Sequence, residues 1–276
     1  MNEDSQMNSS DTKTTTPGRF SSGLKASVIL FAALAVWEVI HKPMSGAVMD
    51  SMGEASGFLF IKTVGLLLVL GIARGIGHWN SLGFRGPFRT ASLLYSLPLM
   101  LLAAAPLSSG APLSGFGTLA LWALLIAIGV TIEEVLCRGS LWTALEEKGI
   151  WRTTVITSVA FGSIHLLGLT GSIPASVILS QAVFAFGTGF TFAAVRIASG
   201  NVWAPIAAHF AFNYPALVAA GGITSAFQPG TEMMMVSGGV VVGLVGIGLV
   251  AVAKRRREKA MMPHTSMAAP ATGAVS

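Results

Sequence analysis

The stretch that decides the fold is FGTLALWALLIAIGVTIEEVLCRGSLW, residues 116–142. Its first part, residues 116–132, contains no charged side chain. An apolar run of roughly 18 to 25 residues has the length of an α-helix that spans a lipid bilayer. Two glutamates and an arginine follow in the same run, where a charge is costly. This stretch therefore predicts a membrane-spanning helix that carries a polar site.

The composition of the whole chain also indicates a membrane protein. Hydrophobic residues make up 53% of the 276 and charged residues only 11%, whereas a soluble domain carries about 25% charged residues. The net charge of +5 does not indicate nucleic-acid binding, because Lys and Arg lie between hydrophobic runs and not on one aromatic-laced face. A single cysteine, Cys137, excludes an intrachain disulfide. We expect the lipid bilayer as a partner and no nucleic acid.

Similar apolar runs recur along the chain and predict an all-α, polytopic membrane helix bundle with about eight transmembrane helices. Residues 21–258 should form this bundle. The polar segment 1–20 and the segment 259–276, which lacks apolar periodicity, should be disordered tails. The predicted spans cover residues 24–41, 56–77, 90–108, 116–142, 152–168, 174–196, 202–220 and 233–253.

The distribution of Lys and Arg orients these spans. Cytoplasmic loops of membrane proteins carry an excess of Lys and Arg. With the N-terminus in the cytoplasm, only Lys42 and Lys62 of the 17 Lys and Arg residues fall on the opposite side. The sequence therefore predicts a multi-pass protein of the plasma membrane with both termini, and both tails, in the cytoplasm.

Ionisable residues inside the apolar runs need a reason to be there, because each costs about 2.5 to 3.5 kcal/mol at a helix centre. Glu38, His41 and Lys42 lie at positions i, i+3 and i+4 beside the outer interface, where they can pair and reach water. We interpret these three residues as structural.

The segment TIEEVLCRG, residues 131–139, places Glu134 and Arg138 four residues apart and so on one helix face. An ion pair between them would offset the cost of burying both charges. Glu133 points about 100° away around the helix and has no such partner, which makes it a candidate general base. The structural alternative is that both glutamates share Arg138 in one packing network.

Two later spans carry histidines at helical spacing. Phe161 and His165 lie four residues apart in AFGSIH, and His209 and Asn213 lie four apart in NVWAPIAAHFAFNYP. His209 and Asn213 could hold a metal, hold a polarised carbonyl, or hold helices together, which is a common role of polar side chains in membranes. A lone histidine beside an aromatic residue is also more often structural than catalytic.

The three segments can reach one layer of the membrane. Counted from the cytoplasmic helix ends at about 1.5 Å per residue, Glu133, His165 and His209 lie roughly 14 to 22 Å deep. A carboxylate, two imidazoles and an amide at one depth form a candidate site for activating water.

These residues resemble the motifs of the CPBP family, also called ABI, which includes prenyl proteases and bacteriocin-processing proteins. Glu133, Glu134 and Arg138 match EExxxR, Phe161 and His165 match FxxxH, and His209 with Asn213 matches HxxxN. The lead-in GNVWAPIAAHFAFN is also similar, and the resemblance is strong over residues 115–220. Cys137 stands where the family usually has an aromatic residue, which affects local packing and not the chemistry.

The resemblance implies an intramembrane endopeptidase, of the type II CaaX prenyl endopeptidase kind, acting on a membrane-associated, in some members prenylated, protein or peptide. Glu133 and His165 would activate a water, His209 and Asn213 would stabilise the oxyanion or orient the site, and Glu134, Arg138 and Phe161 would support them. Family members are often called metalloproteases. Glu133, His165 and His209 suit zinc as well as a metal-free mechanism, so the cofactor is either zinc or none.

Two other classes of function stay open from the sequence. Intramembrane Glu, Arg and His also form ion or proton pathways in transporters, although we find no internal repeat that would favour a transporter. A non-catalytic protein of the same fold, such as a bacteriocin-immunity protein, is the other alternative, because a fold does not guarantee activity.

Overall fold

The computed structural model describes residues 17–104, 107, 110, 112–171 and 173–262, and all regular structure in this part of the chain is helical. The predicted all-α class is confirmed. Most of the predicted tails, 1–20 and 259–276, lie outside the described residues. The helices are α1 (Pro17–Ile40), α2 (Lys42–Met52), α3 (Glu54–Gly75), η1 (Trp79–Ser81), η2 (Thr90–Ser96), α4 (Leu97–Ala104), α5 (Phe116–Glu134), η4 (Val135–Leu141), α6 (Trp142–Leu145), η5 (Glu146–Lys148), α7 (Ile150–His165), η6 (Leu166–Thr170), α8 (Ala175–Ser199), α9 (Trp203–Ala220), α10 (Ile223–Ala226) and α11 (Glu232–Met261).

Six helical segments of the described chain are long and apolar enough to cross a membrane, which makes this an integral membrane protein. They correspond to six of the eight predicted spans. The predicted span 90–108 instead contains a shorter apolar helix, Thr90–Ala104. The predicted span 202–220 is α9, an 18-residue helix that contains His209, Asn213 and Pro215 and is not one of these six segments.

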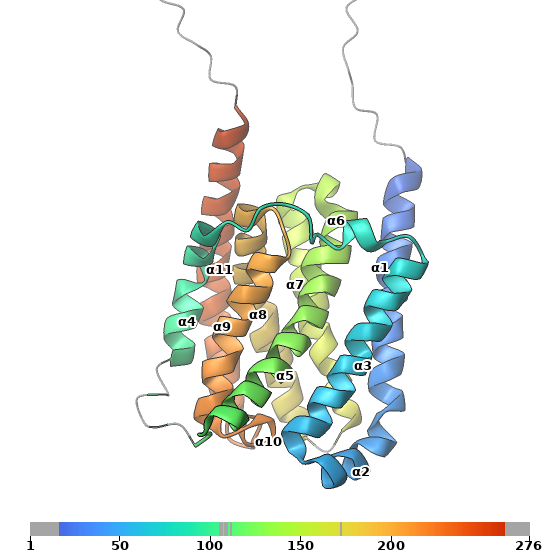
Figure 1. The fold of residues 1–276 in the computed structure, drawn as a ribbon. Helices are drawn as coiled ribbons and strands as arrows, with labels where there is room; N and C mark the ends of the chain where they lie inside the picture. The colour runs from blue at the N-terminus through green and yellow to red at the C-terminus, as the bar shows by residue number, and fades with distance from the viewer. Residues whose placement is uncertain (1–16, 105–106, 108–109, 111, 172, 263–276) are drawn as a thin grey trace, which may run out of the picture.

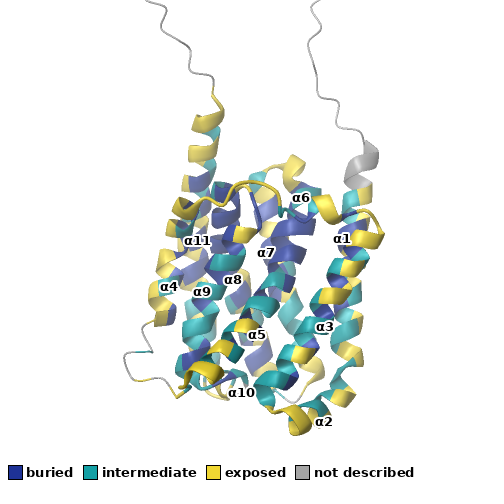
Figure 2. Cartoon of the chain, in the orientation of Figure 1, coloured by how far each residue is buried: buried dark blue, intermediate teal, exposed yellow. Residues whose placement is uncertain are grey.

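The long helices run side by side along one axis, and the chain enters and leaves the bundle at the same end (Figure 1). We call this end, where α1 begins and α11 ends, the upper end. The short helices α2 and α10 lie at the opposite end, which we call the lower end (Figure 1). Buried residues are concentrated along α8 and over Val135–Leu141, whereas α2 and α4 are largely exposed (Figure 2).

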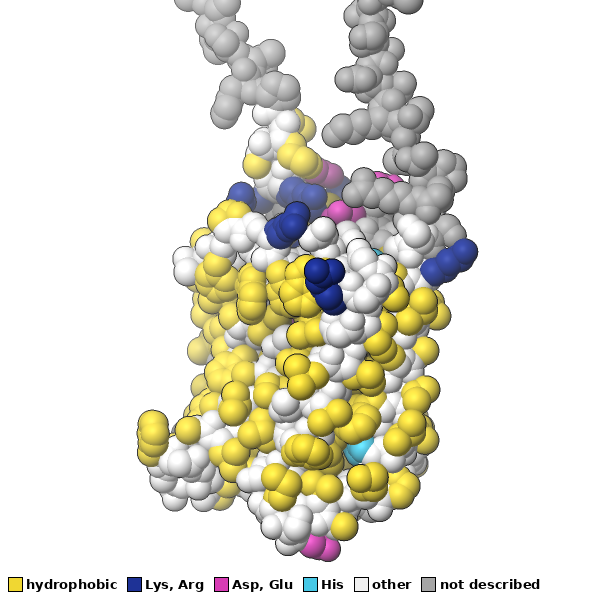
Figure 3. Space-filling view, turned by 45° about the vertical axis from the view of Figure 1, so that its right-hand side comes forward, with side chains coloured by type: hydrophobic (Ala, Val, Ile, Leu, Met, Phe, Trp, Pro, Cys, Tyr) yellow, Lys and Arg dark blue, Asp and Glu magenta, His cyan; other side chains and the backbone are white. Residues whose placement is uncertain are grey.

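The outer surface of the bundle is suited to lipid. Large apolar side chains such as Leu101 and Leu244 are strongly exposed. On the face shown in Figure 3, hydrophobic side chains cover the middle of the molecule, and Lys and Arg gather toward the upper end. An exposed apolar belt with charges beyond its edge is what a bilayer-spanning bundle requires.

Glycines allow α8 and α11 to pack closely along much of their length. A Cβ atom on Gly187 of α8 would overlap the carbonyl oxygen of Gly239 in α11. A Cβ on Gly246 would lie 2.7 Å from the Cβ of Phe190. Small residues at a membrane helix interface let the backbones approach and gain van der Waals contact. The glycines of α11 therefore allow this helix to pack directly against α8.

The loop between α3 and η2 folds back on the start of α9 at the upper end. The backbone N–H of Val202 donates to the carbonyl of Gly83 at 2.9 Å, and the Asn201 amide donates to the carbonyl of Pro87 at 2.7 Å. The indole of Trp203 donates to the carbonyl of Phe84 at 3.1 Å. These bonds fix where α9 begins, and so they fix the depth at which its polar residues lie.

Candidate active site

The predicted helix 116–142 is not a uniform α-helix. It leaves α geometry after Glu134 and continues as a seven-residue π-helix, Val135–Leu141, whose residues are all buried. π-helices are rare and occur mostly as single turns at functional sites. Nothing in the sequence analysis predicted this change of helical geometry. The change of geometry comes directly after Glu133 and Glu134. The two glutamates therefore end the α-helix, and Arg138 lies in the π-helix.

Glu134 and Arg138 form the ion pair that their spacing suggested. The Nη1 atom of Arg138 lies 3.2 Å from Oε1 of Glu134, and both side chains are 0% exposed. Arg138 also donates from Nη2 to the carbonyl of Gly189 at 3.0 Å, and its guanidinium carbon lies 4.4 Å from the centroid of the Phe161 ring. The arginine is therefore held by a carboxylate, a carbonyl and an aromatic face.

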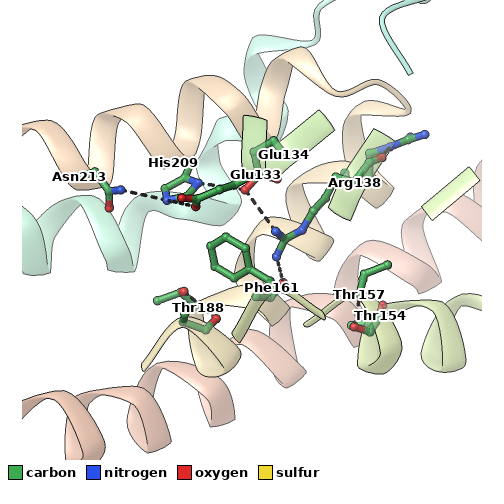
Figure 4. A network of polar contacts seen from close by, with 12 residues as sticks. Glu133, Glu134, Arg138, Thr154, Thr157, Phe161, Thr188, His209 and Asn213 are labelled. Carbon is green, nitrogen blue, oxygen red and sulfur yellow. Dashed lines mark hydrogen bonds and ion pairs between the residues drawn. The ribbon is translucent and has the colours of Figure 1, made fainter. Parts of the chain in front are cut away.

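Glu134 has a second partner, His209, which lies on a different helix. Its Oε1 atom is 3.0 Å from Nδ1 of His209, and the Nε2 atom of the same ring is 3.0 Å from the amide nitrogen of Asn213. Because a carboxylate accepts, Nδ1 carries the proton in this pair. In neutral His209, Nε2 then accepts from Asn213. Figure 4 shows this chain of contacts from Asn213 through His209 to Glu134 and Arg138.

Glu133 is placed differently from its neighbour. Its side chain is 25% exposed, and its closest ionic contact is between Oε2 and Nε2 of His209, at 3.9 Å. In the described part of the chain it forms no ion pair with Arg138. The alternative in which both glutamates share Arg138 is therefore not what the structure contains. The Glu133 carboxylate lies beside the imidazole of His209 (Figure 4) and is more exposed than that of Glu134.

His165 lies at the end of α7 and is partly buried. Its Nδ1 atom is 2.9 Å from the carbonyl oxygen of Phe161, so Nδ1 donates and Nε2 keeps its lone pair. Among the described residues, no hydrogen bond or ion pair joins His165 directly to Glu133. The structure thus brings Glu133, Glu134, His209 and Asn213 into contact and leaves His165 at the side of the group.

Aromatic rings connect these parts. Phe161 meets both imidazoles edge-on, with centroid distances of 5.3 Å to His165 and 5.4 Å to His209. Phe192 of α8 stacks on His209 at 4.5 Å. Phe192 was not predicted as a site residue, because nothing in its sequence surroundings distinguishes it from other apolar residues of α8. Rings on two sides of His209 fix the plane of the imidazole.

The placement of these side chains does not fit the zinc site that the sequence allowed through Glu133, His165 and His209. Among the residues that the structure describes, no three His, Cys, Asp or Glu side chains are grouped as metal ligands would be. Both ring nitrogens of His209 already have hydrogen-bond partners. A metal ligand needs a nitrogen lone pair that is free to point at the ion.

The polar residues at the lower end form a separate cluster. Glu38 accepts from Lys62 at 2.7 Å and lies 3.1 Å from His41, while Lys42 donates to the carbonyl of Leu167 at 3.2 Å. These contacts join α1, α2, α3 and η6. Burial lowers the pKa of Lys42, which sits between these elements. The cluster holds helices together and does not contact the residues around His209.

A bundle of apolar helices with a largely buried group of glutamate, histidine and asparagine side chains defines an integral membrane protein with an interior polar site. Residues 115–215 match a protein family described as type II CAAX prenyl endopeptidase, Rce1-like. This match confirms the family resemblance and covers all the predicted site residues. It supports a protease, and hence a hydrolase, in general terms. No curated protein matches the chain.

Proposed function

We propose that this protein is an intramembrane endopeptidase in which Glu133 activates the attacking water. One observation carries the proposal most strongly. A partly exposed carboxylate, Glu133, lies 3.9 Å from an imidazole that is fixed from behind by the fully buried Glu134. A general base must be accessible to water, whereas the groups that orient the site can be buried.

The chemistry assigns a distinct task to each group. The Glu133 carboxylate takes a proton from water, and the oxygen attacks the carbonyl carbon of the scissile peptide bond. The Asn213 amide gives one N–H to His209, and its second N–H is available for the oxyanion that forms. When the C–N bond breaks, Glu133 returns the proton to the leaving amine. His165 offers Nε2 as a further acceptor for the water.

His209 acts mainly by position in this scheme. Its Nδ1–H bond to Glu134 sets the tautomer, and Phe192 and Phe161 set the ring plane. With Nδ1 protonated, Nε2 accepts from Asn213 and so directs the amide toward the carbonyl that is attacked. If His209 becomes protonated during turnover, both nearby glutamates stabilise the imidazolium.

The proposed substrate is a membrane-associated protein or peptide. The site lies inside a bundle with an apolar outer surface, so a substrate that partitions into the bilayer reaches it at the highest local concentration. The description of the matched family names a CAAX prenyl endopeptidase, and a prenyl chain would supply such partitioning, at about 0.8 kcal/mol per buried CH₂. We propose that the chain resides in the plasma membrane with both termini in the cytoplasm.

An unbiased comparison of peptide ends tests the activity. Membranes containing the wild-type protein, Glu133→Gln or Glu147→Gln are incubated, and new protein termini are identified by mass spectrometry. Glu147 is exposed beyond the site and serves as a matched control. We expect termini that occur with the wild type and with Glu147→Gln and are lost with Glu133→Gln. If all three samples give the same termini, the protein is not this protease.

A second experiment tests the prenyl group. Two synthetic peptides of identical sequence ending in a CaaX motif, one farnesylated on the cysteine of that motif and one not, are offered to the purified protein in lipid nanodiscs. Faster cleavage of the farnesylated peptide supports a prenylated substrate. Equal cleavage of both peptides would leave the protease proposal standing and remove the prenyl part of it.

A further inference from the structure

The π-helix that follows Glu134 is held from outside by a residue that belongs to none of the three motifs. Arg196, in the last turn of α8, donates from Nε to the backbone carbonyl of Arg138 at 2.9 Å. Arg138 is the centre of the π-helix and the ion-pair partner of Glu134. Arg196 therefore contacts the backbone of a residue whose side chain orders the candidate active site.

Burial makes this contact more than incidental. Arg196 is only 6% exposed, and its guanidinium carbon lies 5.7 Å from the Trp142 ring centroid. No carboxylate oxygen of the described residues lies within 4.0 Å of its guanidinium nitrogens. A buried charge without a close counter-charge is costly. The hydrogen bond of Arg196 goes to the backbone carbonyl of Arg138, which indicates a role in holding the backbone geometry.

Three further contacts hold the same turn on its other sides. The hydroxyl of Ser140 lies 2.7 Å from the hydroxyl of Ser27 in α1 and 2.9 Å from Nε2 of His78. Burial lowers the pKa of His78, so the ring is neutral near pH 7 and can accept from Ser140. A Cβ atom on Gly139 would overlap the carbonyl oxygen of Leu82. α1, the loop after α3 and α8 thus all abut residues 138–140.

The geometry of a π-turn explains why such support matters. One residue corresponds to about 100° around an α-helix, so a turn that holds an extra residue changes the direction of the side chains before it relative to those after it. If residues 135–141 returned to α geometry, Glu133 and Glu134 could not keep their present directions toward His209 while Arg138 kept its own. The π form is therefore a condition for the observed arrangement.

We infer that Arg196 is a positioning residue, which keeps Val135–Leu141 in the π form and thereby aims Glu133 and Glu134 at His209. The catalytic part of this inference rests on the proposed function. Arg196 acts through the backbone of Arg138 and touches none of the reacting groups. Ser140, with Ser27 and His78, assists it from the opposite side of the turn.

The test uses Arg196→Met, with Arg152→Met as the matched control, because Arg152 is an exposed arginine near the same end of the bundle. The only cysteine of the chain, Cys137, lies inside the π-helix and is fully buried. Its labelling rate with membrane-permeant N-ethylmaleimide reports the packing of the turn without requiring any activity. Peptide cleavage is measured in parallel, with kcat and KM determined separately.

We expect Arg196→Met to label Cys137 at least several times faster than wild type and to lower kcat by about ten- to a hundredfold with KM nearly unchanged. Arg152→Met should match the wild type in both measurements. If Arg196→Met folds poorly, Ser140→Ala is measured in its place. It should also speed the labelling of Cys137 and lower kcat, both by smaller factors.

Other outcomes separate the two proposals. Unchanged labelling together with unchanged kcat overturns the inference, and so does faster labelling with unchanged kcat, because the turn would then move without affecting the site. If the wild type cleaves no peptide, the proposed function fails. The labelling comparison then still decides whether Arg196 holds the π-helix.

Discussion

Oε1 of Glu134 and Nδ1 of His209 lie 3.0 Å apart although the two residues are separated by 75 positions in the sequence. The same oxygen also accepts from Arg138. One carboxylate oxygen therefore orders an arginine on its own helical segment and an imidazole on α9. The bond ties the two halves of the candidate site together, and it makes Glu134 an orienting residue while Glu133 stays accessible.

The two adjacent glutamates should respond differently to substitution. Glu133→Gln should keep abundance and thermal stability near wild type and remove most cleavage, because an amide of similar shape cannot take the proton from water. Glu134→Gln should mainly destabilise, by roughly 3 to 5 kcal/mol, because it leaves Arg138 as an uncompensated buried charge. Abundance, thermal midpoint in detergent and cleavage are measured for both variants.

A double variant checks the reason for the destabilisation. Glu134→Gln combined with Arg138→Met should recover much of the lost thermal stability, as removal of both members of a buried pair often does. The roles of the glutamates would be reversed if Glu133→Gln cleaved normally and Glu134→Gln were stable but inactive.

Asn213 should contribute to turnover through its amide. Asn213→Ala should lower kcat by about 10² to 10³, the usual effect of removing one oxyanion donor.

A membrane-permeant chelator should leave the wild-type rate unchanged, since the placement of Glu133, His165 and His209 does not fit a zinc site. Loss of activity on chelation that is restored by added zinc, together with stoichiometric zinc in the active protein, would contradict the metal-free mechanism.

The close contact between α8 and α11 should depend on its glycines. Gly239→Ala would place a Cβ atom 2.8 Å from the Cα of Phe184, so the helices must separate. We expect a lower thermal midpoint in detergent. Gly248→Ala is the matched control on the same helix, because a Cβ atom there would meet nothing within 4 Å. Equal midpoints for the two variants would contradict the close packing of α8 against α11.

The topology can be tested with single cysteines in a Cys137→Ser background. Ser5→Cys and Ser276→Cys should be protected from an impermeant thiol reagent added outside intact cells, because the charge distribution places both tails in the cytoplasm. Ser51→Cys in the exposed part of α2, at the lower end, should react and serves as the positive control. Labelling of either tail in sealed cells would reject the proposed orientation.

The sequence by itself determined that the chain belongs in a membrane and that it is helical, and it supplied the residues of the candidate site. Apolar runs of bilayer length specify membrane helices, because an unpaired backbone group is too costly in lipid. Helical periodicity also determined relations within one helix, such as the pairing of Glu134 with Arg138 and of His209 with Asn213. The shortness of Thr90–Ala104 and the mixed composition of α9 explain why two of the eight expected spans differ from the rest.

Only the tertiary structure decided how these helices meet. Whether Glu133 or Glu134 bonds to His209, and whether His165 touches Glu133, depends on rotation and depth of separate helices, which periodicity within one helix does not define. The π-helix at Val135–Leu141 likewise depends on contacts from α1, α8 and the loop after α3. Those contacts join residues far apart in sequence, and so the direction of the two glutamates is a property of the packed bundle.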